Sequence, residues 1–408
     1  MDALFWKTHA VKVLFMTRSL GVGGAERQLC VLAKQFKTRG VDVAVAVFYS
    51  GGTLQAELVA LGIPVIDLRK NGRWDVLAFS LHLFILLRKQ RPDVVYAYLS
   101  VSNILAVLNK PFFPRMRVVC GVRASRLDSA HYHWTVTLLW RIECILSRFA
   151  DLVICNSVAG LEHAAYHGFP REKMVVVHNG IDTSEFRPCA EDRERVRTQW
   201  GLVKNDIVIG LVARLDPMKD HRTFLAAAAE LAHERHDVRF VCIGDGPPEY
   251  RTELIAHARR LGLDGRLVWA GARADMPAIY CALDVCCSSS AFGEGFSNAI
   301  AEAMASGVPC VVTDVGDSAR VVGDAGRVVP PGDARALKAS MLELLRDNGL
   351  HKRLKRLSRD RVVNHFGLAA LADATLRELH RVCGSSRDLP RREQTQGRAV
   401  EQRNDGHR

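Results

Sequence analysis

Two glutamates, Glu294 and Glu302, have the spacing and surroundings that first suggest chemistry in this sequence. Glu294 lies in the glycine-rich segment 293–298, and Glu302 lies in the apolar segment 299–305, which has a helix-forming composition. A carboxylate can accept hydrogen bonds from two neighbouring hydroxyl groups, and this suits a sugar or the diol of a ribose. The pair therefore indicates a polyol-binding site on both sides of a loop-to-helix junction.

The junction itself indicates an anion site. Segment 283–290 before it reads as a short buried strand, and Gly307 after it is a usual helix-ending residue. Ser297 or Asn298 can cap the helix start, where free backbone N–H groups and the helix dipole favour a phosphate. Two glutamates at this spacing are by themselves a weak signal, usually two solvated charges. The glycines, the strand and the helix start together favour a nucleotide-sugar site.

Two cations precede this stretch in the same half of the chain. Arg214 follows the strand-like segment 206–212, and Lys219 comes just before a helix that starts near Asp220. Strand ends are where parallel sheets bind ligands, so two cations here can hold a diphosphate and neutralise its charge as it leaves. An isolated pair at this spacing would more often be ordinary surface charge. The position at a strand end favours the functional interpretation.

Near the start of the chain, Gly23 and Gly24 follow the strand-like segment 11–16 and open a helix-like segment. Glycines at this point of a β-α-β unit let the backbone approach a phosphate closely. A dinucleotide-binding dehydrogenase is the competing interpretation. It is disfavoured because Glu26 occupies the third glycine position, and the second strand, 41–49, ends without an acidic residue for a ribose.

Strand-like and helix-like segments alternate along the whole chain, which predicts parallel sheets covered on both faces. One series ends near residue 180 and a second begins at 206–212. We therefore expect an α/β protein of two Rossmann-like domains facing each other across a cleft. These are an acceptor domain, 1–180, and a donor domain, 181–384, whose last helices pack back on the first domain. The polar segment 385–408 is expected to be a disordered tail.

The composition is that of a globular protein with an acidic partner. The 408 residues carry a formal net charge of +12, which favours an anionic membrane surface, nucleic acid or phosphorylated substrates. Eleven cysteines without framework spacing indicate a reducing compartment. Residues 1–10 do not resemble a signal peptide, and the apolar run 76–87 is too short to span a bilayer. We expect a cytoplasmic protein.

Taken together, these features resemble a known family. The chain is similar to retaining glycosyltransferases of the GT-B fold in family 4, the glycosyl transferases group 1. Within that family it is most similar to the branch that builds bacterial surface polysaccharides. The resemblance covers almost the whole chain and rests on motifs that occur in the same order: Gly23–Glu26, Asn156–Ser157, Asn179–Asp182, Arg214 with Lys219, Gly244–Pro247, Glu294 with Glu302, Gly307–Pro309 and Val329–Asp333.

The resemblance implies roles for the site residues. Glu294 would bind hydroxyl groups of the donor sugar, and Glu302 would bind the ribose diol. The acceptor would be a glycan, in particular a lipid-linked glycan of capsule, O-antigen or exopolysaccharide synthesis. Backbone amides of four consecutive residues would hold the sugar and the phosphate: Gly295, Phe296, Ser297 and Asn298.

It also implies a mechanism. Arg214 and Lys219 would grip the diphosphate and form the catalytic set with Glu294, while Gly23 and Gly24 would close over it from the other domain. The leaving phosphate would help to deprotonate the acceptor hydroxyl on the same face of the sugar, so that the anomeric configuration is retained. Relatives need no metal or other cofactor, and the sequence contains no Asp-x-Asp motif.

One departure concerns the first domain. Many relatives place a histidine near the donor sugar, just after a strand, and Arg123 occupies that place here. His131 and His133 come later, among aromatic residues, where they could line the acceptor site or belong to a half-buried aromatic cluster. Which of these three residues, if any, has a catalytic role stays open.

Segment 111–148 interleaves basic residues with aromatic ones, among them Phe112 and Trp140. This pattern favours an anionic membrane surface, on the inner face of the cell membrane, where a lipid-linked acceptor is presented. Nucleic acid would also suit it, but no nucleic-acid module is recognisable.

Two rival functions are a non-catalytic nucleotide-sugar-binding subunit and, disfavoured by Glu26, an NAD-dependent oxidoreductase.

Overall fold

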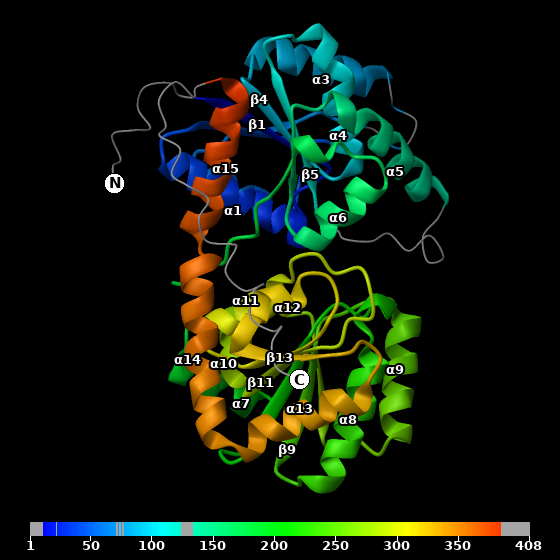
Figure 1. The fold of residues 1–408 in the computed structure, drawn as a ribbon, viewed down its shortest axis with the longest axis vertical. Coiled ribbons are helices and arrows are strands. Elements are labelled where there is room, and N and C mark those ends of the chain that lie inside the picture. The colour runs from blue at the N-terminus through cyan, green and yellow to red at the C-terminus, as the bar shows by residue number, and fades with distance from the viewer. Residues whose placement is uncertain are drawn as a thin grey trace, which may run out of the picture.

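The structure is a computed structural model that describes residues 11–384, apart from residues 22, 71, 73, 74, 76 and 124–133. His131, His133 and the expected tail at 385–408 lie outside the described residues. Two parallel sheets, each with helices on both faces, form two halves that face each other (Figure 1). The α/β fold class predicted from the alternating segments is confirmed.

The N-terminal half is built on a seven-stranded sheet with the order β3-β2-β1-β4-β5-β6-β7. All of its neighbouring strands pair in parallel. Its strands are β1 (Lys12–Thr17), β2 (Asp42–Val47), β3 (Val65–Asp67), β4 (Val94–Tyr98), β5 (Arg117–Val122), β6 (Leu152–Cys155) and β7 (Met174–Val176). Its helices are α1 (Gly24–Thr38), α2 (Thr53–Ala60), α3 (Leu77–Gln90), α4 (Ser100–Asn109), α5 (Trp134–Leu146) and α6 (Val158–Tyr166), with a short 3-10 helix, η2 (Lys110–Phe112), after α4.

The C-terminal half is built on a six-stranded parallel sheet with the order β10-β9-β8-β11-β12-β13. Its strands are β8 (Ile207–Val212), β9 (Val238–Ile243), β10 (Leu267–Gly271), β11 (Val285–Ser288), β12 (Cys310–Thr313) and β13 (Gly326–Val329). Its helices are α7 (Ala190–Gln199), α8 (His221–Glu234), α9 (Pro248–Arg260), α10 (Met276–Ala282), α11 (Asn298–Ala305), α12 (Ser318–Val322), α13 (Ala334–Arg346) and α14 (Asn348–His365), with the 3-10 helix η5 (Pro217–Lys219) before α8.

The strands are short runs of apolar residues because helices cover both faces of each sheet. In β8, for example, residues 208–211 are buried on both faces. Each half has two hydrophobic clusters, one on each face of its sheet. The rigid sheets place their carboxyl ends, where ligands bind in this architecture, at the junction of the two halves.

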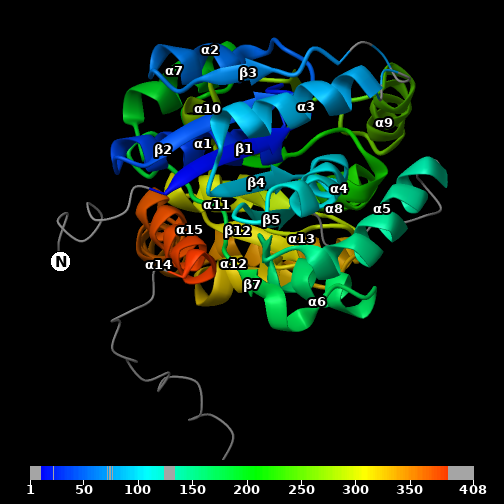
Figure 2. The same cartoon turned by 90° about the horizontal axis from the view of Figure 1, so that it is seen from above.

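The last helix crosses back to the N-terminal half. α14 lies along the C-terminal half, and α15 (Leu368–Cys383) packs on α1, with Leu371, Leu376 and Leu379 in the same apolar cluster as α1. Figures 1 and 2 show α14 and α15 following one another along one side of the molecule. At the point of crossing, Ile181 donates a backbone hydrogen bond to Phe366 at 2.8 Å. The chain therefore passes between the halves at two adjacent places.

Candidate active site

Both sheets reverse their strand order beside the predicted site residues. In the N-terminal half the reversal lies between β1 and β4, and Gly23 and Gly24 follow β1. In the C-terminal half it lies between β8 and β11, and Lys219 and Glu294 follow these two strands. Loops diverge at such a reversal and leave room for a ligand at the carboxyl ends of the strands. Residues that are far apart in the sequence are thereby brought to one place.

Glu294 is held in a fixed, paired position. The Lys219 ammonium group forms an ion pair with Glu294 Oε1, and the Ser290 hydroxyl donates to the same oxygen at 2.7 Å. Lys219 is itself fixed, since η5 begins with a turn in which Asp216 Oδ1 accepts from the Met218 N–H at 2.9 Å. The Lys219 and Glu294 side chains are only 17% and 7% exposed. The structure thus joins one predicted cation and one predicted carboxylate in a single buried pair.

Glu302 lies one turn inside α11 and is almost completely buried. It accepts a hydrogen bond from the Tyr280 hydroxyl at 3.0 Å. Burial raises the pKa of Glu302 to about 7, against the opposing effects of the Arg27 charge and of the Tyr280 hydrogen bond. Arg27 belongs to α1, so the N-terminal half acts electrostatically on this carboxyl group. A partly protonated carboxyl can both donate to and accept from a diol.

The start of α11 presents backbone donors. Ser297 is the residue before its first turn, but its side chain makes no capping hydrogen bond, so the predicted Ser297 cap is absent. Asn298 accepts from the Asn179 side-chain amide of the N-terminal half at 2.8 Å. The Phe296 ring packs in the core beside His178 and Phe366, so this residue can offer a ligand only its backbone. Free N–H groups at a helix start favour an oxyanion.

Gly295 allows the two halves to meet closely, and the start of α1 lies nearby. A Cβ atom on Gly295 would lie 2.9 Å from Asn156 Oδ1, and one on Gly24 would lie 3.6 Å from Asn298 Nδ2. Asn156 Oδ1 is buried and has no hydrogen-bond partner. The starts of α1 and α11 therefore lie close together, with an unsatisfied acceptor next to Gly295. Gly23 precedes α1 without a side-chain cap, which leaves the first N–H groups of this helix available as well.

The Arg214 side chain is more exposed and more loosely paired than that of Lys219. It follows the end of β8, as predicted, but 70% of its side chain is exposed, and its only ion pair within the described residues is a loose contact of 3.6 Å with Asp216. An exposed, loosely paired guanidinium can move to meet a ligand, whereas a buried pair cannot. Of the two predicted cations, Lys219 is therefore fixed in its ion pair with Glu294, whereas the Arg214 side chain can still move to contact a ligand.

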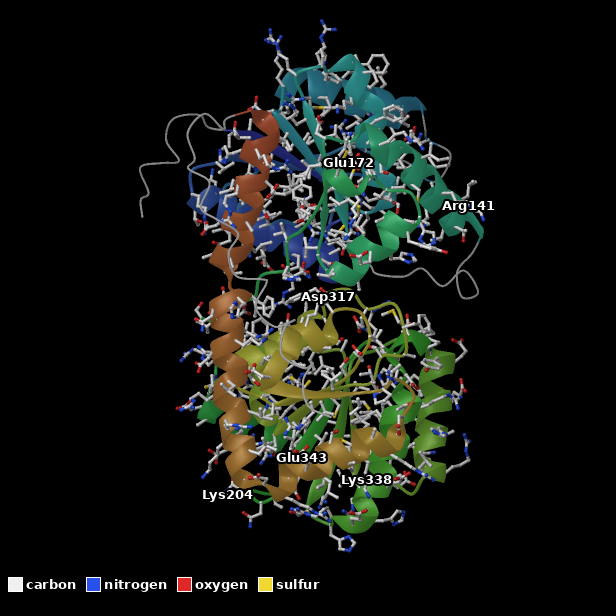
Figure 3. The ribbon with its side chains drawn as sticks, in the orientation of Figure 1. Arg141, Glu172, Lys204, Asp317, Lys338 and Glu343 are labelled. Atoms are coloured by element: carbon white, nitrogen blue, oxygen red, sulfur yellow. The ribbon has the colours of Figure 1, made fainter. Side chains whose placement is uncertain are left out.

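Sequence reasoning missed Asp317, which joins the two halves. Its carboxylate accepts from the backbone N–H of Val158 at 2.7 Å and of Ala159 at 2.9 Å, at the start of α6. Asp317 is 1% exposed and lies at the junction of the halves in Figure 3. No sequence pattern could reveal it, because its partners are two backbone groups 158 and 159 positions away.

Comparisons with known proteins agree with this geometry. Residues 22–185 match the family described as Glycosyltransferase Family 4, and residues 206–347 match Glycosyl transferases group 1. The chain is 30% identical to a 2-deoxystreptamine glucosyltransferase of Streptomyces kanamyceticus over 92% of this chain and 100% of that protein. This chain belongs to glycosyltransferase family 4. The predicted family is confirmed.

The GT-B fold and the predicted branch are also confirmed. The crystal structure of Anabaena HepE in complex with UDP superimposes with a TM-score of 0.80 at 26% identity, covering 91% of this chain and 100% of that one. An Escherichia coli UDP-Gal:alpha-D-GlcNAc-diphosphoundecaprenol alpha-1,3-galactosyltransferase is 26% identical over 71% of this chain and 76% of that protein. The homologues of this glycosyltransferase include enzymes of bacterial polysaccharide and lipid-linked glycan synthesis.

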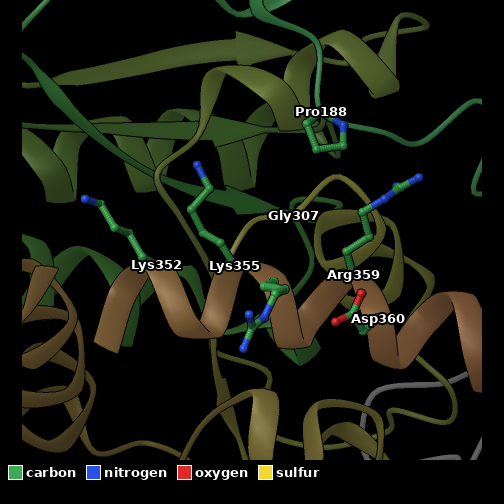
Figure 4. A pocket seen from close by; sticks show the side chains of 7 residues that line it. Pro188, Gly307, Lys352, Lys355, Arg359 and Asp360 are labelled. Carbon is green, nitrogen blue, oxygen red and sulfur yellow. The ribbon is translucent and has the colours of Figure 1, made fainter. Parts of the chain in front are cut away.

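A cavity of about 390 Å³ lies at the other end of α11 in this family 4 glycosyltransferase (Figure 4). It is lined by Gly307, Pro188 and side chains of α14, including Lys352 and Lys355. Arg359, also in its wall, donates to the carbonyl groups of Ala305 at the end of α11 and of Phe186. A cation at a helix C-terminus stabilises the helix. We therefore assign this cavity a structural role, separate from the candidate active site.

Two features are absent from the part of the chain that the structure describes. No cluster of three or more His, Cys, Asp or Glu side chains there could hold a metal ion. None of the helices described has both the length and the apolar character needed to cross a membrane.

Proposed function

We propose that this glycosyltransferase moves a sugar from a nucleoside diphosphate sugar to a hydroxyl group of a lipid-linked glycan, with retention of anomeric configuration and without a metal. The product would belong to a bacterial surface polysaccharide such as a capsule, an O-antigen or an exopolysaccharide. The observation that carries this proposal is the buried Lys219–Glu294 pair beside the uncapped start of α11. It supports the proposal because a cation, a carboxylate and the backbone amides of a helix start lie side by side.

The proposed reaction uses groups that the geometry provides. Glu294 would bind hydroxyl groups of the transferred sugar, and Glu302 would bind the ribose. Backbone N–H groups at the start of α11, with Arg214 and Lys219, would stabilise the diphosphate as the bond between the anomeric carbon and the phosphate oxygen breaks. That phosphate oxygen would take the proton of the acceptor hydroxyl, whose oxygen forms the new bond on the same face. No protein base is needed in this scheme.

Uridine diphosphate is the donor moiety we propose, because the solved HepE structures that this chain resembles contain UDP and UDP-glucose. The first test is the thermal stability of the full chain with UDP, GDP or NAD, each with and without EDTA. A ligand at a hundred times its Kd adds about 2.7 kcal/mol of stability, which shifts the melting midpoint by a few degrees. We expect a shift with UDP that EDTA does not remove. A shift with NAD alone would overturn the proposal.

The stereochemical course is tested on the product. We would incubate the enzyme with an α-linked UDP-sugar and a short-chain lipid-linked acceptor, and determine the new linkage by NMR. An α-linkage supports retention, and a β-linkage would refute it. Binding of UDP without any transfer, across several sugars and acceptors, would instead support a non-catalytic nucleotide-sugar-binding subunit.

We also propose that the enzyme works at the inner face of the cell membrane. Large apolar side chains are exposed on neighbouring elements of the N-terminal half: Leu81 and Ile85 on α3, Phe112 on η2, Ile145 on α5 and Phe149. Phe112 packs edge-on against Phe84 of α3 at 5.8 Å, so α3 and η2 form one surface. Apolar side chains next to basic ones suit an anionic membrane surface.

Flotation with vesicles that contain an anionic phospholipid tests the membrane proposal. We expect binding that salt weakens, and about tenfold weaker binding for Phe112→Ser, because a buried aromatic side chain contributes roughly 1.5–3 kcal/mol. Val203→Ser is the matched control, since Val203 is an exposed apolar residue of the C-terminal half. Equal flotation of the two variants would exclude the surface around Phe112.

A further inference from the structure

Arg123 stands out among the cations near the junction of the halves because none of the acids that the structure describes pairs with it. Lys219 pairs with Glu294, Arg214 pairs with Asp216, and the Arg27 charge acts on Glu302. Arg123 forms no ion pair with any carboxylate of the residues that the structure describes. Its partners are neutral: its guanidinium donates to the Tyr96 hydroxyl at 2.7 Å and to Asn179 Oδ1 at 3.4 Å.

The Arg123 guanidinium is also partly shielded from water. It lies 4.2 Å from the centre of the Tyr98 ring, and its Nε–H is buried without a hydrogen-bond partner among the described residues. Shielding a charge from water is unfavourable unless an opposite charge compensates for it. A guanidinium has five donors in a fork that matches the oxygens of a phosphate, and the contacts above use only part of this capacity.

The position of Arg123 indicates that a bound anion would be its opposite charge. Arg123 follows the end of β5, and Asn179, which it contacts, donates to Asn298 Oδ1 at 2.8 Å. Asn298 begins α11, and the start of α1 lies against it. Two helix starts and one uncompensated guanidinium thus converge from three elements, and each of them favours an oxyanion.

The backbone before Arg123 is held firmly, so the guanidinium is in place before any ligand arrives. The Asn103 side chain donates to the Gly121 carbonyl and accepts from the Gly121 N–H, both at 3.2 Å. Asn103 also donates to Glu143 Oε1 at 2.6 Å, and Glu143 is buried. A charged group fixed in advance loses little conformational freedom when it binds.

We propose that Arg123 is a binding residue for a phosphate oxyanion of the substrates, contributed by the N-terminal half to the site. This inference rests on the proposed function. The phosphate has two sources that share one chemistry, the diphosphate of the nucleotide donor and the diphosphate of a lipid-linked acceptor. Closing of the halves then brings the cation of one half to an anion held on α11 of the other.

Calorimetric titration of the full chain with UDP tests the donor source. Loss of charge-assisted hydrogen bonds predicts about 10- to 100-fold weaker UDP binding for Arg123→Gln, with Arg123→Lys in between. Arg117→Gln is the matched control. Arg117 lies at the other end of the same strand, where it pairs with Asp151 at 3.3 Å, and its removal changes the net charge equally. We expect UDP binding by this variant to equal that of the unmodified protein.

Titration of the UDP-saturated protein with geranyl diphosphate tests the acceptor source. If the unmodified protein binds this probe and Arg123→Gln does not, while UDP binding is equal in both, the phosphate belongs to the acceptor. If neither affinity falls by more than twofold in Arg123→Gln, the inference is wrong and the proposed function stands. If the unmodified protein does not bind UDP at all, the proposed function fails and this inference fails with it.

The melting midpoint without ligand separates binding from a merely structural role. If Arg123 only clamps the tyrosines and Asn179, Arg123→Gln should melt at a clearly lower temperature. If its charge is kept for an anion, removal of an unbalanced charge should leave the midpoint equal or higher, as is common at functional sites. A lower midpoint with unchanged binding of both UDP and geranyl diphosphate would overturn the proposal.

Discussion

Asp317 offers a direct test of how the two halves are held together. It is the residue before α12, yet its side chain makes no capping hydrogen bond to that helix. Its carboxylate instead accepts from Val158 N at 2.7 Å and Ala159 N at 2.9 Å, the free donors at the start of α6 in the other half. Asp317→Ala should therefore weaken the contact between the halves without disturbing its own helix.

The magnitude follows from these contacts. Capping a helix start contributes about 1 kcal/mol, and hydrogen bonds to a charged group contribute roughly 1.5–3 kcal/mol. A loss of about 2 kcal/mol from the closed form alone shifts the ratio of open to closed molecules by roughly 30-fold. Asp317→Asn keeps one carbonyl oxygen as an acceptor and should have a smaller effect. Asp324→Ala, which removes an exposed acid of the same half, is the control.

The assay is a distance measurement between the halves. Spin labels at positions 141 and 204, both exposed and in opposite halves (Figure 3), report their separation by pulsed electron resonance. The labels are attached to cysteines introduced at these two positions. The native cysteines Cys189 and Cys383 must be replaced, because the remaining native cysteines are buried and would not be labelled. We expect Asp317→Ala to broaden the distance distribution toward longer values, and UDP to reverse this in part. An unchanged distribution in Asp317→Ala would refute the assigned role of the carboxylate.

Two further predictions concern the two carboxylates of the proposed donor site. Lys219→Met leaves Glu294 buried without its cation, so we expect turnover to fall strongly and the free energy of unfolding to fall by about 3 kcal/mol; near-normal turnover would argue against the pair. For Glu302, burial raises the pKa from 4.5 to about 7 in the folded state. Its ionisation therefore opposes folding, and stability is lost as pH rises from about 4.5 through 7. Glu302→Gln should match the unmodified protein at pH 4 and exceed it by up to about 3 kcal/mol at pH 8 in urea unfolding; an equal difference at both pH values would show that Glu302 does not titrate as described.

Much of the fold was predictable because short apolar runs alternate with helical segments. The strand predicted at 206–212 is β8 (Ile207–Val212), and the one predicted at 11–16 is β1 (Lys12–Thr17). Local sequence predicts these two strands well, since both of their faces are buried. The order of the strands depends on contacts between distant segments, and local patterns do not contain it.

The candidate site was predictable only in part, for the same physical reason. The side chains of Glu294, Lys219 and Arg214 lie at strand or helix ends as expected, but the ion pair between Lys219 and Glu294 follows from β8 lying beside β11. The predicted side-chain cap by Ser297 does not form. A capping preference is weak, about 1 kcal/mol, and the fit of segment 293–298 against the other half outweighs it.

The proposed donor-binding loop, residues 293–298, is held by contacts that cross the junction of the halves. The Asp317 N–H donates to the Gly295 carbonyl at 3.2 Å, while the Asp317 side chain accepts from the start of α6. The same residue therefore holds the loop beside Glu294 and ties it to the N-terminal half. Because Asn298 also accepts from Asn179, which contacts Arg123, the start of α11 is linked to the N-terminal half by a second route. Any motion that separates the halves must break both links, so closing of the halves and formation of the proposed phosphate site would be one event.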